Sequence, residues 1–479
     1  MLFNSIEFAI FFPVVAALYF ALPRSLKTPL LLVSSCVFYM AFIPAYLSIL
    51  AVTIAIDYTA GIYLERTTGR ARRYLLIVSI VSTCLVLAIF KYFYFVTGNA
   101  VALAGLFGWR LTGPSIHIIL PIGLSFHTFQ SLSYVIEVYR GRQKAEINFI
   151  TYATYVMFFP QLVAGPIERP QNLLHQFYED HQVDFTRIAS GLKRMAWGFF
   201  KKLVVADRLA LYVNDVYGAP DQHSGLQLLI GTFFFAYQIY CDFSGYSDIA
   251  IGSARVLGFK LMENFNTPYV AQSIGEFWKR WHISLSSWFR DYVYIPLGGN
   301  RASTGRWCVN IFVTFGLSGL WHGANWTYVI WGLLNGLYLV FGRFTEKARA
   351  RAFALVGVHE DSWIRHAFML LGTFALTCIA WVFFRAPTFH DAIHILTRLG
   401  TEWSYSALST EHFPLRYLPI AVSSILALEF GQLAIKRCWP ARVLPALPVP
   451  VRLFTYSALV IVVVMFGVYQ RTPFIYFQF

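Results

Sequence analysis

The segment from Val309 to Phe341 contains no Asp, Glu, Lys or Arg. As a single helix it would extend about 50 Å, whereas about 30 Å is enough to cross the hydrocarbon core of a bilayer. The segment therefore predicts a broken helix or a helical hairpin within a membrane. It carries one histidine, His322, close to Gly316, Gly319 and Gly323. Histidines at membrane depth commonly serve function; the alternative is a neutral histidine that hydrogen-bonds between helices.

The composition of the whole chain supports the same class of protein. Hydrophobic residues make up 57% and charged residues 13%, about half the charged fraction of soluble proteins. Apolar segments separated by short basic loops predict α-helices, because a membrane barrel would show alternating strands of about ten residues. We therefore expect an all-α polytopic integral membrane protein, with about 11–12 membrane helices that include broken or re-entrant segments around a central cavity.

The net charge of +14 does not indicate nucleic-acid binding, because the Lys and Arg residues cluster beside apolar runs. The six cysteines are scattered singly, so neither a disulfide framework nor a metal site is expected. The first residues lack the positive leader of a signal peptide, and the first apolar run should be retained as a spanning helix. The positive-inside pattern places five basic loops in the cytoplasm and both ends of the chain outside; these loops hold Arg24, Arg66, Arg140, Arg349 and Arg437.

The section from 148 to 308 is more polar than its surroundings. We interpret it as a re-entrant or interfacial core section that builds a cytoplasmic funnel. A new span begins over Leu228–Tyr240, and the polar run Cys241–Asp248 should interrupt it.

Asp242 and Asp248 are carboxylates in this apolar setting. Pairing is the usual fate of a membrane carboxylate, so we expect an ion pair with Arg255 or Arg280. Cation binding and the orientation of a histidine are the alternatives.

The remaining histidines of note have simpler explanations. We expect a satisfied interior position for His127 and a solvated surface position for the three histidines of the outside loop 386–415, which are His390, His394 and His412.

A second histidine, His282, lies forty positions before His322, and each of them follows a tryptophan. Around His282 the chain is basic and aromatic. These features belong to a longer stretch, Glu276 to Trp326, which is one of three that resemble the membrane-bound O-acyltransferase family. The other two are Phe158–Gln161 with Gly165-Pro166, and Asp242–Asp248.

The resemblance covers most of the chain and implies one membrane-bound O-acyltransferase domain over residues 1–479. The match is nearest to the bacterial branch that includes alginate O-acetyltransferases. It identifies His322 as the signature histidine and aligns His282 with the family's upstream histidine or asparagine.

The family implies acyl transfer from a cytoplasmic thioester to an acceptor that is reached from the outer face. We expect an acetyl group, acetyl-CoA or another acyl thioester as donor substrate, no bound cofactor, and an exported polysaccharide such as alginate as acceptor. Acyl transfer needs a base and a donor to the oxyanion. We assign His322 as general base, and His282 as the group that orients the thioester carbonyl or donates to the oxyanion. Asn325 is the weaker candidate for that second role.

Three basic residues, Lys279, Arg280 and Arg290, could bind phosphates of coenzyme A or an acidic carrier protein. Simple positive-inside anchoring explains them equally well.

Residues 474–479, here called the aromatic tail, hold one hydroxyl, that of Tyr476. The tail resembles the C-terminal motif of the small partner peptide in teichoic-acid D-alanylation, in which a tyrosine receives the acyl group. Tyr476 is therefore a candidate acyl relay. A phenol, with a pKa of about 10, is nearer to a thiol than an ordinary alcohol is, so its ester keeps transfer potential. The alternative is an interfacial aromatic anchor.

The outside loop 386–415 is too short for a hydrolase-like domain, so a separate extracytoplasmic acyltransferase should complete the reaction. We expect a multi-pass protein of the bacterial inner membrane, in contact with lipids and not with nucleic acid. Alternatives within the enzyme class are a teichoic-acid D-alanyltransferase and a lipid or protein acyltransferase. A transporter or channel without chemistry is the rival class.

The predicted topology can be tested with single cysteines. Cysteine at position 70 or 349 should resist a membrane-impermeant maleimide applied from outside, because both positions lie in basic loops. Cysteine at position 390 should react, and the unsubstituted chain gives the background of the native thiols. Labelling at 70 or 349 in intact cells would overturn the topology.

Overall fold

The computed structural model describes residues 1–479 except 114–117, 119, 164, 400, 404–407, 439–447, 470–473 and 476–479, and it describes only the backbone of 434–438. All regular structure in the described residues is helical, and no strand occurs among them. Five helical segments are long and apolar enough to cross a membrane: Tyr46–Arg66, Gly69–Leu106, Gly225–Leu257, Trp363–Arg385 and Val449–Phe466. The expected class, an all-α polytopic membrane protein, is confirmed, while the number of 11–12 crossings stays a prediction.

The chain that we expected to form one domain divides into two compact units. Unit 1 comprises residues 1–195 and 247–262, and unit 2 comprises residues 196–246 and 263–479. Two helices contribute residues to both units: α10 (Phe185–Phe199) and α12 (Gly225–Leu257). The section 148–308 therefore contributes to both units.

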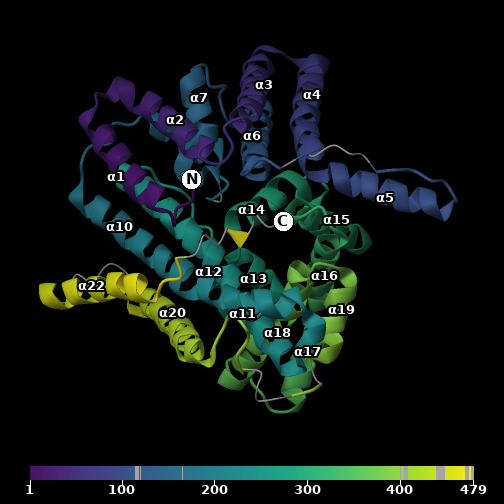
Figure 1. Ribbon diagram of the computed structural model, residues 1–479. Helices are drawn as coiled ribbons and strands as arrows, with labels where there is room; N and C mark the ends of the chain where they lie inside the picture. The colour runs from purple at the N-terminus through teal and green to yellow at the C-terminus, as the bar shows by residue number, and fades with distance from the viewer. Residues whose placement is uncertain are drawn as a thin grey trace. The chain divides into compact units, whose positions relative to one another are not determined.

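Unit 1 holds the N-terminal helices (Figure 1). These are α1 (Ile6–Ala21), α2 (Arg24–Met40), α3 (Tyr46–Arg66), α4 (Gly69–Leu87), η1 (Ala88–Tyr92), α5 (Phe93–Leu106), α6 (Leu124–Tyr139), α7 (Phe149–Met157), α8 (Phe159–Leu162), α9 (Pro170–Leu173) and η2 (Leu174–Tyr178).

The loops of unit 1 that we expect in the cytoplasm bond to one another. Lys27 Nζ lies 3.0 Å from Asp180 Oδ1, and Arg24 donates to the carbonyl of Tyr178. The Tyr178 hydroxyl donates to Glu146 Oε1 at 2.7 Å. These contacts join three polar segments of the unit, and their side of the membrane stays a prediction. The interior position of His127 is also confirmed, since it is fully buried with Nε2 2.9 Å from Thr53 Oγ1.

Helix α12 runs without a break from Gly225 to Leu257, so the predicted interruption at Cys241–Asp248 is wrong. Both carboxylates are paired, but not with Arg255 or Arg280. Within unit 2, Asp242 Oδ1 lies 2.5 Å from Lys202 Nζ, and within unit 1, Asp248 Oδ1 lies 2.9 Å from Arg194 Nη2. Because a neighbouring segment supplies these cations, the helix can carry two carboxylates without breaking.

Unit 2 contains the other helices. These are η3 (Phe200–Ala206, a π-helical turn), α11 (Asp207–Gly218), η4 (Pro220–Gln222), η5 (Pro268–Val270), α13 (Ile274–Arg280), α14 (Ile283–Phe289), η6 (Arg290–Tyr294), η7 (Gly299–Arg301), α15 (Thr304–His322), α16 (Trp326–Phe344), α17 (Glu346–Leu355), α18 (Trp363–Arg385), α19 (Phe389–Arg398), η9 (Leu415–Tyr417), α20 (Leu418–Cys438) and α22 (Val449–Phe466).

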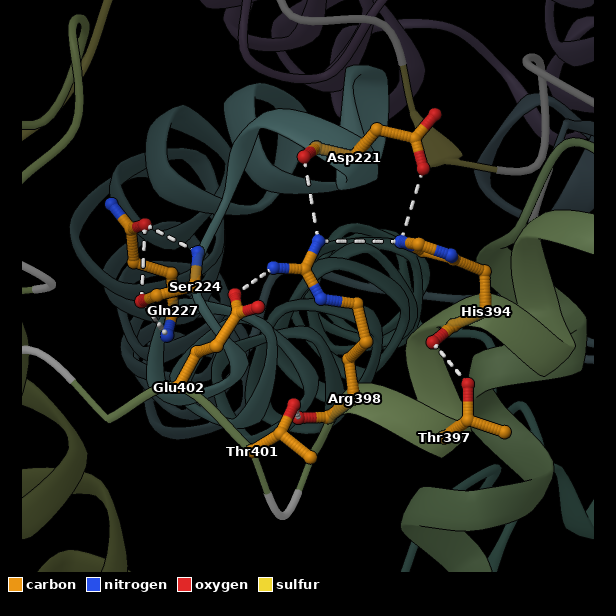
Figure 2. A network of polar contacts seen from close by, with 8 residues as sticks. All are labelled: Asp221, Ser224, Gln227, His394, Thr397, Arg398, Thr401 and Glu402. Atoms are coloured by element: carbon orange, nitrogen blue, oxygen red, sulfur yellow. Dashed lines mark hydrogen bonds and ion pairs between the residues drawn. The ribbon is translucent and has the colours of Figure 1, made fainter.

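Surface pairs fix the loop around α19. His394 Nε2 lies 3.0 Å from Asp221 Oδ1 and 3.4 Å from Arg398 Nη1, and Figure 2 shows these side chains pointing toward one another. His394 is 25% exposed and His390 is 88% exposed, so both are surface histidines as expected, and His394 has charged partners in addition.

His412 is an exposed histidine with a partner. Its Nδ1 lies 2.7 Å from Asp215 Oδ1, and this hydrogen bond and the carboxylate's charge raise the pKa of His412.

Helices α15 and α16 form the predicted hairpin, and it closes on glycines. A Cβ on Gly332 would lie 2.2 Å from the carbonyl oxygen of Phe315 and 3.1 Å from the Cα of Gly319. Only hydrogen side chains permit such an approach of two backbones.

We expect Gly332→Ala to destabilise the protein by about 1–3 kcal/mol, because the added methyl overpacks the hairpin. Gly342→Ala is the matched control in the same helix, where a Cβ meets nothing within 4 Å. The measurement is the thermal unfolding midpoint in detergent. Equal midpoints for the two variants would contradict the close packing.

Candidate active site

His282 lies at a sharp turn between two short helices. Helix α13 begins at the Ser273 cap, whose hydroxyl accepts from the N–H of Glu276 at 3.1 Å, and α14 begins directly after His282. The histidine backbone is left-handed, with φ +42°, and the residue is fully buried. Such a conformation is uncommon for a residue other than glycine and is often found at functional sites.

Asn264 fixes the ring of His282, and sequence reasoning missed this residue. Its Oδ1 accepts from the backbone N–H of Ser284 at 3.3 Å and from the Ser284 hydroxyl at 2.9 Å, and it lies 3.1 Å from His282 Nδ1. An oxygen that already accepts from a backbone N–H requires His282 Nδ1 to donate. The only sequence signal was a polar run, Glu263–Thr267, between apolar segments.

The tautomer gives His282 a hydrogen-bond acceptor at Nε2. Burial lowers the pKa of His282 to about 3, so the ring is neutral at pH 7. With the hydrogen on Nδ1, the lone pair lies on Nε2. The geometry therefore presents Nε2 as a hydrogen-bond acceptor, whereas the predicted donation to an oxyanion requires a donor at this nitrogen.

His322, the last residue of α15, lies in an aromatic cage. It is 3% exposed. Its ring meets Trp331 edge-on at 4.9 Å and Phe384 at 5.5 Å, and Trp331 stacks on Trp381 at 5.8 Å. Helices α15, α16 and α18 thus surround the signature histidine with apolar rings, which exclude water from it.

The indole of Trp321 contacts both histidines. Its ring centroid lies 6.2 Å from that of His282 and 5.0 Å from that of His322. Two histidines forty positions apart therefore belong to one buried cluster in unit 2, as the sequence motif predicted.

The other predicted site residues lie outside this cluster. Asn325 caps α16, since its Oδ1 accepts from the N–H of Thr327 at 3.1 Å and its Nδ2 donates to the carbonyl of Pro387 at 3.3 Å. Arg280 forms an ion pair with Glu276 at 2.6 Å, and Arg290 pairs with Asp291 at 2.8 Å.

Lys279 is exposed and lies in the last turn of α13. Arg290 is exposed as well, with 63% of its side chain accessible. The substrate-binding roles of all four residues stay predictions.

The start of the aromatic tail is buried in unit 2. Phe474 is fully buried and its ring lies 5.6 Å from that of Phe243, which in turn meets His282 edge-on at 4.5 Å. Ile475 donates its backbone N–H to Asp242 Oδ2 at 2.7 Å. Tyr476, the candidate relay, lies outside the described residues. The described part of the tail therefore reaches a ring that contacts the histidine cluster.

Comparison with known proteins gives concordant results. A model of the membrane-bound O-acyltransferase family matches residues 140–384, a range that contains both histidines. The chain is 39% identical over 440 residues to the probable alginate O-acetylase AlgI of Pseudomonas aeruginosa, covering 90% of this chain and 81% of that protein.

Two other relatives have different names. The peptidoglycan O-acetyltransferase of Helicobacter pylori is 34% identical, over 83% of this chain and 79% of its own length. The teichoic acid D-alanyltransferase of Bacillus subtilis is 27% identical, over 58% of this chain and 71% of its own length.

We expect His282→Asn to lower turnover by about 10²–10³-fold, because asparagine cannot place a ring nitrogen acceptor at this position. Asparagine tolerates the left-handed backbone, so strain does not confound the result. The measurement is acyl transfer at saturating donor. His282→Ala should lose at least as much activity. Near-normal turnover in His282→Asn would mean that an amide donor suffices, as the oxyanion assignment requires.

Proposed function

The chain belongs to the membrane-bound O-acyltransferase family, and from this membership we propose that it transfers an acetyl group from cytoplasmic acetyl-CoA toward an exported polysaccharide. The observation that carries the proposal is the buried cluster in which Trp321 contacts both His282 and His322. Paired histidines in a dry aromatic setting suit proton transfer during attack of a hydroxyl on a thioester.

The first step is transfer to Tyr476. His322 takes the phenolic proton, the oxygen attacks the thioester carbonyl, and the C–S bond breaks. The leaving thiolate, whose thiol has a pKa of about 8.5, regains the proton from the imidazolium and departs as coenzyme A. His282, oriented by Asn264 with Nδ1 3.1 Å from Asn264 Oδ1, presents Nε2 as a hydrogen-bond acceptor for the attacking hydroxyl.

The second step moves the acetyl group outward. A hydroxyl on the outer side attacks the tyrosyl ester, the acetyl–tyrosyl bond breaks, and the proton of the attacking hydroxyl restores the phenol. Relatives named for alginate and peptidoglycan acetylation support a polysaccharide acceptor. An extracytoplasmic acyltransferase partner would accept the acetyl group first. The protein would lie in the bacterial inner membrane, where a single bilayer separates the cytoplasmic donor from the exported acceptor.

Acetyl transfer is favoured over D-alanyl transfer because the relatives named as O-acetylases cover most of this chain, at 34–39% identity. The relative named as a D-alanyltransferase covers 58% of the chain at 27% identity. A transporter without chemistry does not account for the family match over both histidines.

The decisive experiment uses the purified full-length protein with radiolabelled acetyl-CoA. We expect label on the peptide that contains Tyr476, no label in His322→Ala, and no label there in Tyr476→Phe, which keeps the ring and loses only the nucleophilic oxygen. Acceptor acetylation in cells should be lost in both variants at equal protein level.

The two variants separate the parts of the proposal. Full acceptor acetylation in Tyr476→Phe would rule out Tyr476 as the acyl relay and would leave the roles proposed for the two histidines unchanged. Wild-type activity in His322→Ala would rule out His322 as the general base. Labelling by a D-alanyl thioester but not by acetyl-CoA would mean that the transferred group is D-alanyl and not acetyl.

A further inference from the structure

Three hydrogen bonds tie the end of α22 and the segment that follows it to the rest of unit 2. Arg208 Nη2 donates to the carbonyl of Phe466 at 2.6 Å, and the N–H of Val468 donates to the carbonyl of Leu203 at 3.0 Å. The third contact is the bond from the N–H of Ile475 to Asp242 Oδ2, at 2.7 Å. It lies nearest to Tyr476 in the sequence and uses a charged acceptor.

Asp242 is part of a buried ionic cluster. Lys202 Nζ lies 2.8 Å from Asp207 Oδ1 and 2.5 Å from Asp242 Oδ1, and the three side chains are 2–5% exposed. Buried charges are costly unless they are paired and hydrogen-bonded. The cluster holds two carboxylates for one ammonium, so the N–H of Ile475 gives Asp242 a charge-assisted hydrogen bond that helps to satisfy the second carboxylate.

The residue after Asp242 connects the same helix to the histidines. Phe474 packs on Phe243 at 5.6 Å and on Tyr246 at 4.8 Å, and Phe243 meets His282 at 4.5 Å. Two neighbouring residues of α12 therefore hold the tail by its backbone and by its side chain. Lys202 stands in the π-helical turn η3, a kind of distortion that often marks functional sites.

We propose that Asp242, held in place by Lys202, is a positioning residue that clamps Phe474 and Ile475, the start of the aromatic tail, beside the histidine cluster. The proposal rests on the proposed function, since the tail is worth positioning only if Tyr476 carries the acyl group. Fixing the nucleophile replaces an encounter between a free segment and the thioester with reaction from one geometry, and misplacement by about 1 Å can cost 10²-fold in rate.

The cluster offers a matched pair of variants. Asp242→Ala removes the acceptor of the tail and leaves one ion pair, Lys202–Asp207. Asp207→Ala removes the other carboxylate and leaves the pair Lys202–Asp242 together with the bond to Ile475. Both variants lose one buried carboxylate and keep a balanced pair, so general destabilisation should be similar.

The readouts are hydrogen exchange of the C-terminal peptide and the rate of Tyr476 acetylation, both on the full-length protein. We expect Asp242→Ala to exchange faster at Ile475 and to acetylate about 10²-fold more slowly. Asp207→Ala should keep wild-type exchange at Ile475 and lose only a few-fold in rate. Asp242→Asn, which keeps an acceptor oxygen, should recover part of both.

Each other outcome is decisive. Equal exchange at Ile475 in Asp242→Ala and wild type overturns the clamp. Faster hydrogen exchange at Ile475 with an unchanged rate of Tyr476 acetylation overturns the role of the clamp in the reaction. Equal losses of acetylation rate in Asp242→Ala and Asp207→Ala would mean that the ionic cluster has only a structural role. Failure of the proposed function looks different: Tyr476 would not be acetylated in wild type, while hydrogen exchange would still report on the clamp.

Discussion

The structure depends on the pairing of buried charge along α12. This helix carries Asp242 and Asp248 through a largely buried environment, where an unpaired carboxylate would cost several kcal/mol. Lys202 and Arg194 neutralise them, each within its own unit. Because these cations belong to the preceding helical segment, the two stretches of chain must lie side by side. These ion pairs allow α12 to stay continuous, and one of the paired carboxylates, Asp242, also accepts from the N–H of Ile475.

A second constraint is the exclusion of water around the histidines. His322 is enclosed by Trp331 and Phe384, and His282 is enclosed by Phe243 and Trp321. Aromatic rings give large apolar area with few rotatable bonds, so they can hold an imidazole edge without competing for its nitrogens. In such a site each remaining polar contact carries more weight than it would in water, and the contact of Asn264 with His282 is of this kind.

The assignment of His282 shows how one hydrogen bond changes a chemical interpretation. The resemblance to the family, taken alone, allowed His282 to be a hydrogen-bond donor to the oxyanion. The N–H of Ser284 fixes the oxygen of Asn264, that oxygen fixes the hydrogen of His282 on Nδ1, and burial keeps the ring neutral. The nitrogen that remains is an acceptor. The buried cluster thus contains two imidazoles, and that of His282 presents a hydrogen-bond acceptor.

A family resemblance predicted the two histidines as the centre of the site. The sequence by itself determined the class of protein, the helical hairpin around His322, and the pairing of Asp242 and Asp248 with some cation. Hydropathy and spacing carry that information because they act along one helix or one loop. The tertiary structure decided the partners: Lys202 and Arg194 in place of the expected arginines, Asn264 beside His282, Trp321 between the histidines, and the N–H of Ile475 on Asp242. These contacts join residues 18 to 233 positions apart, and no local periodicity encodes which of several chemically equivalent side chains packing brings within hydrogen-bonding distance.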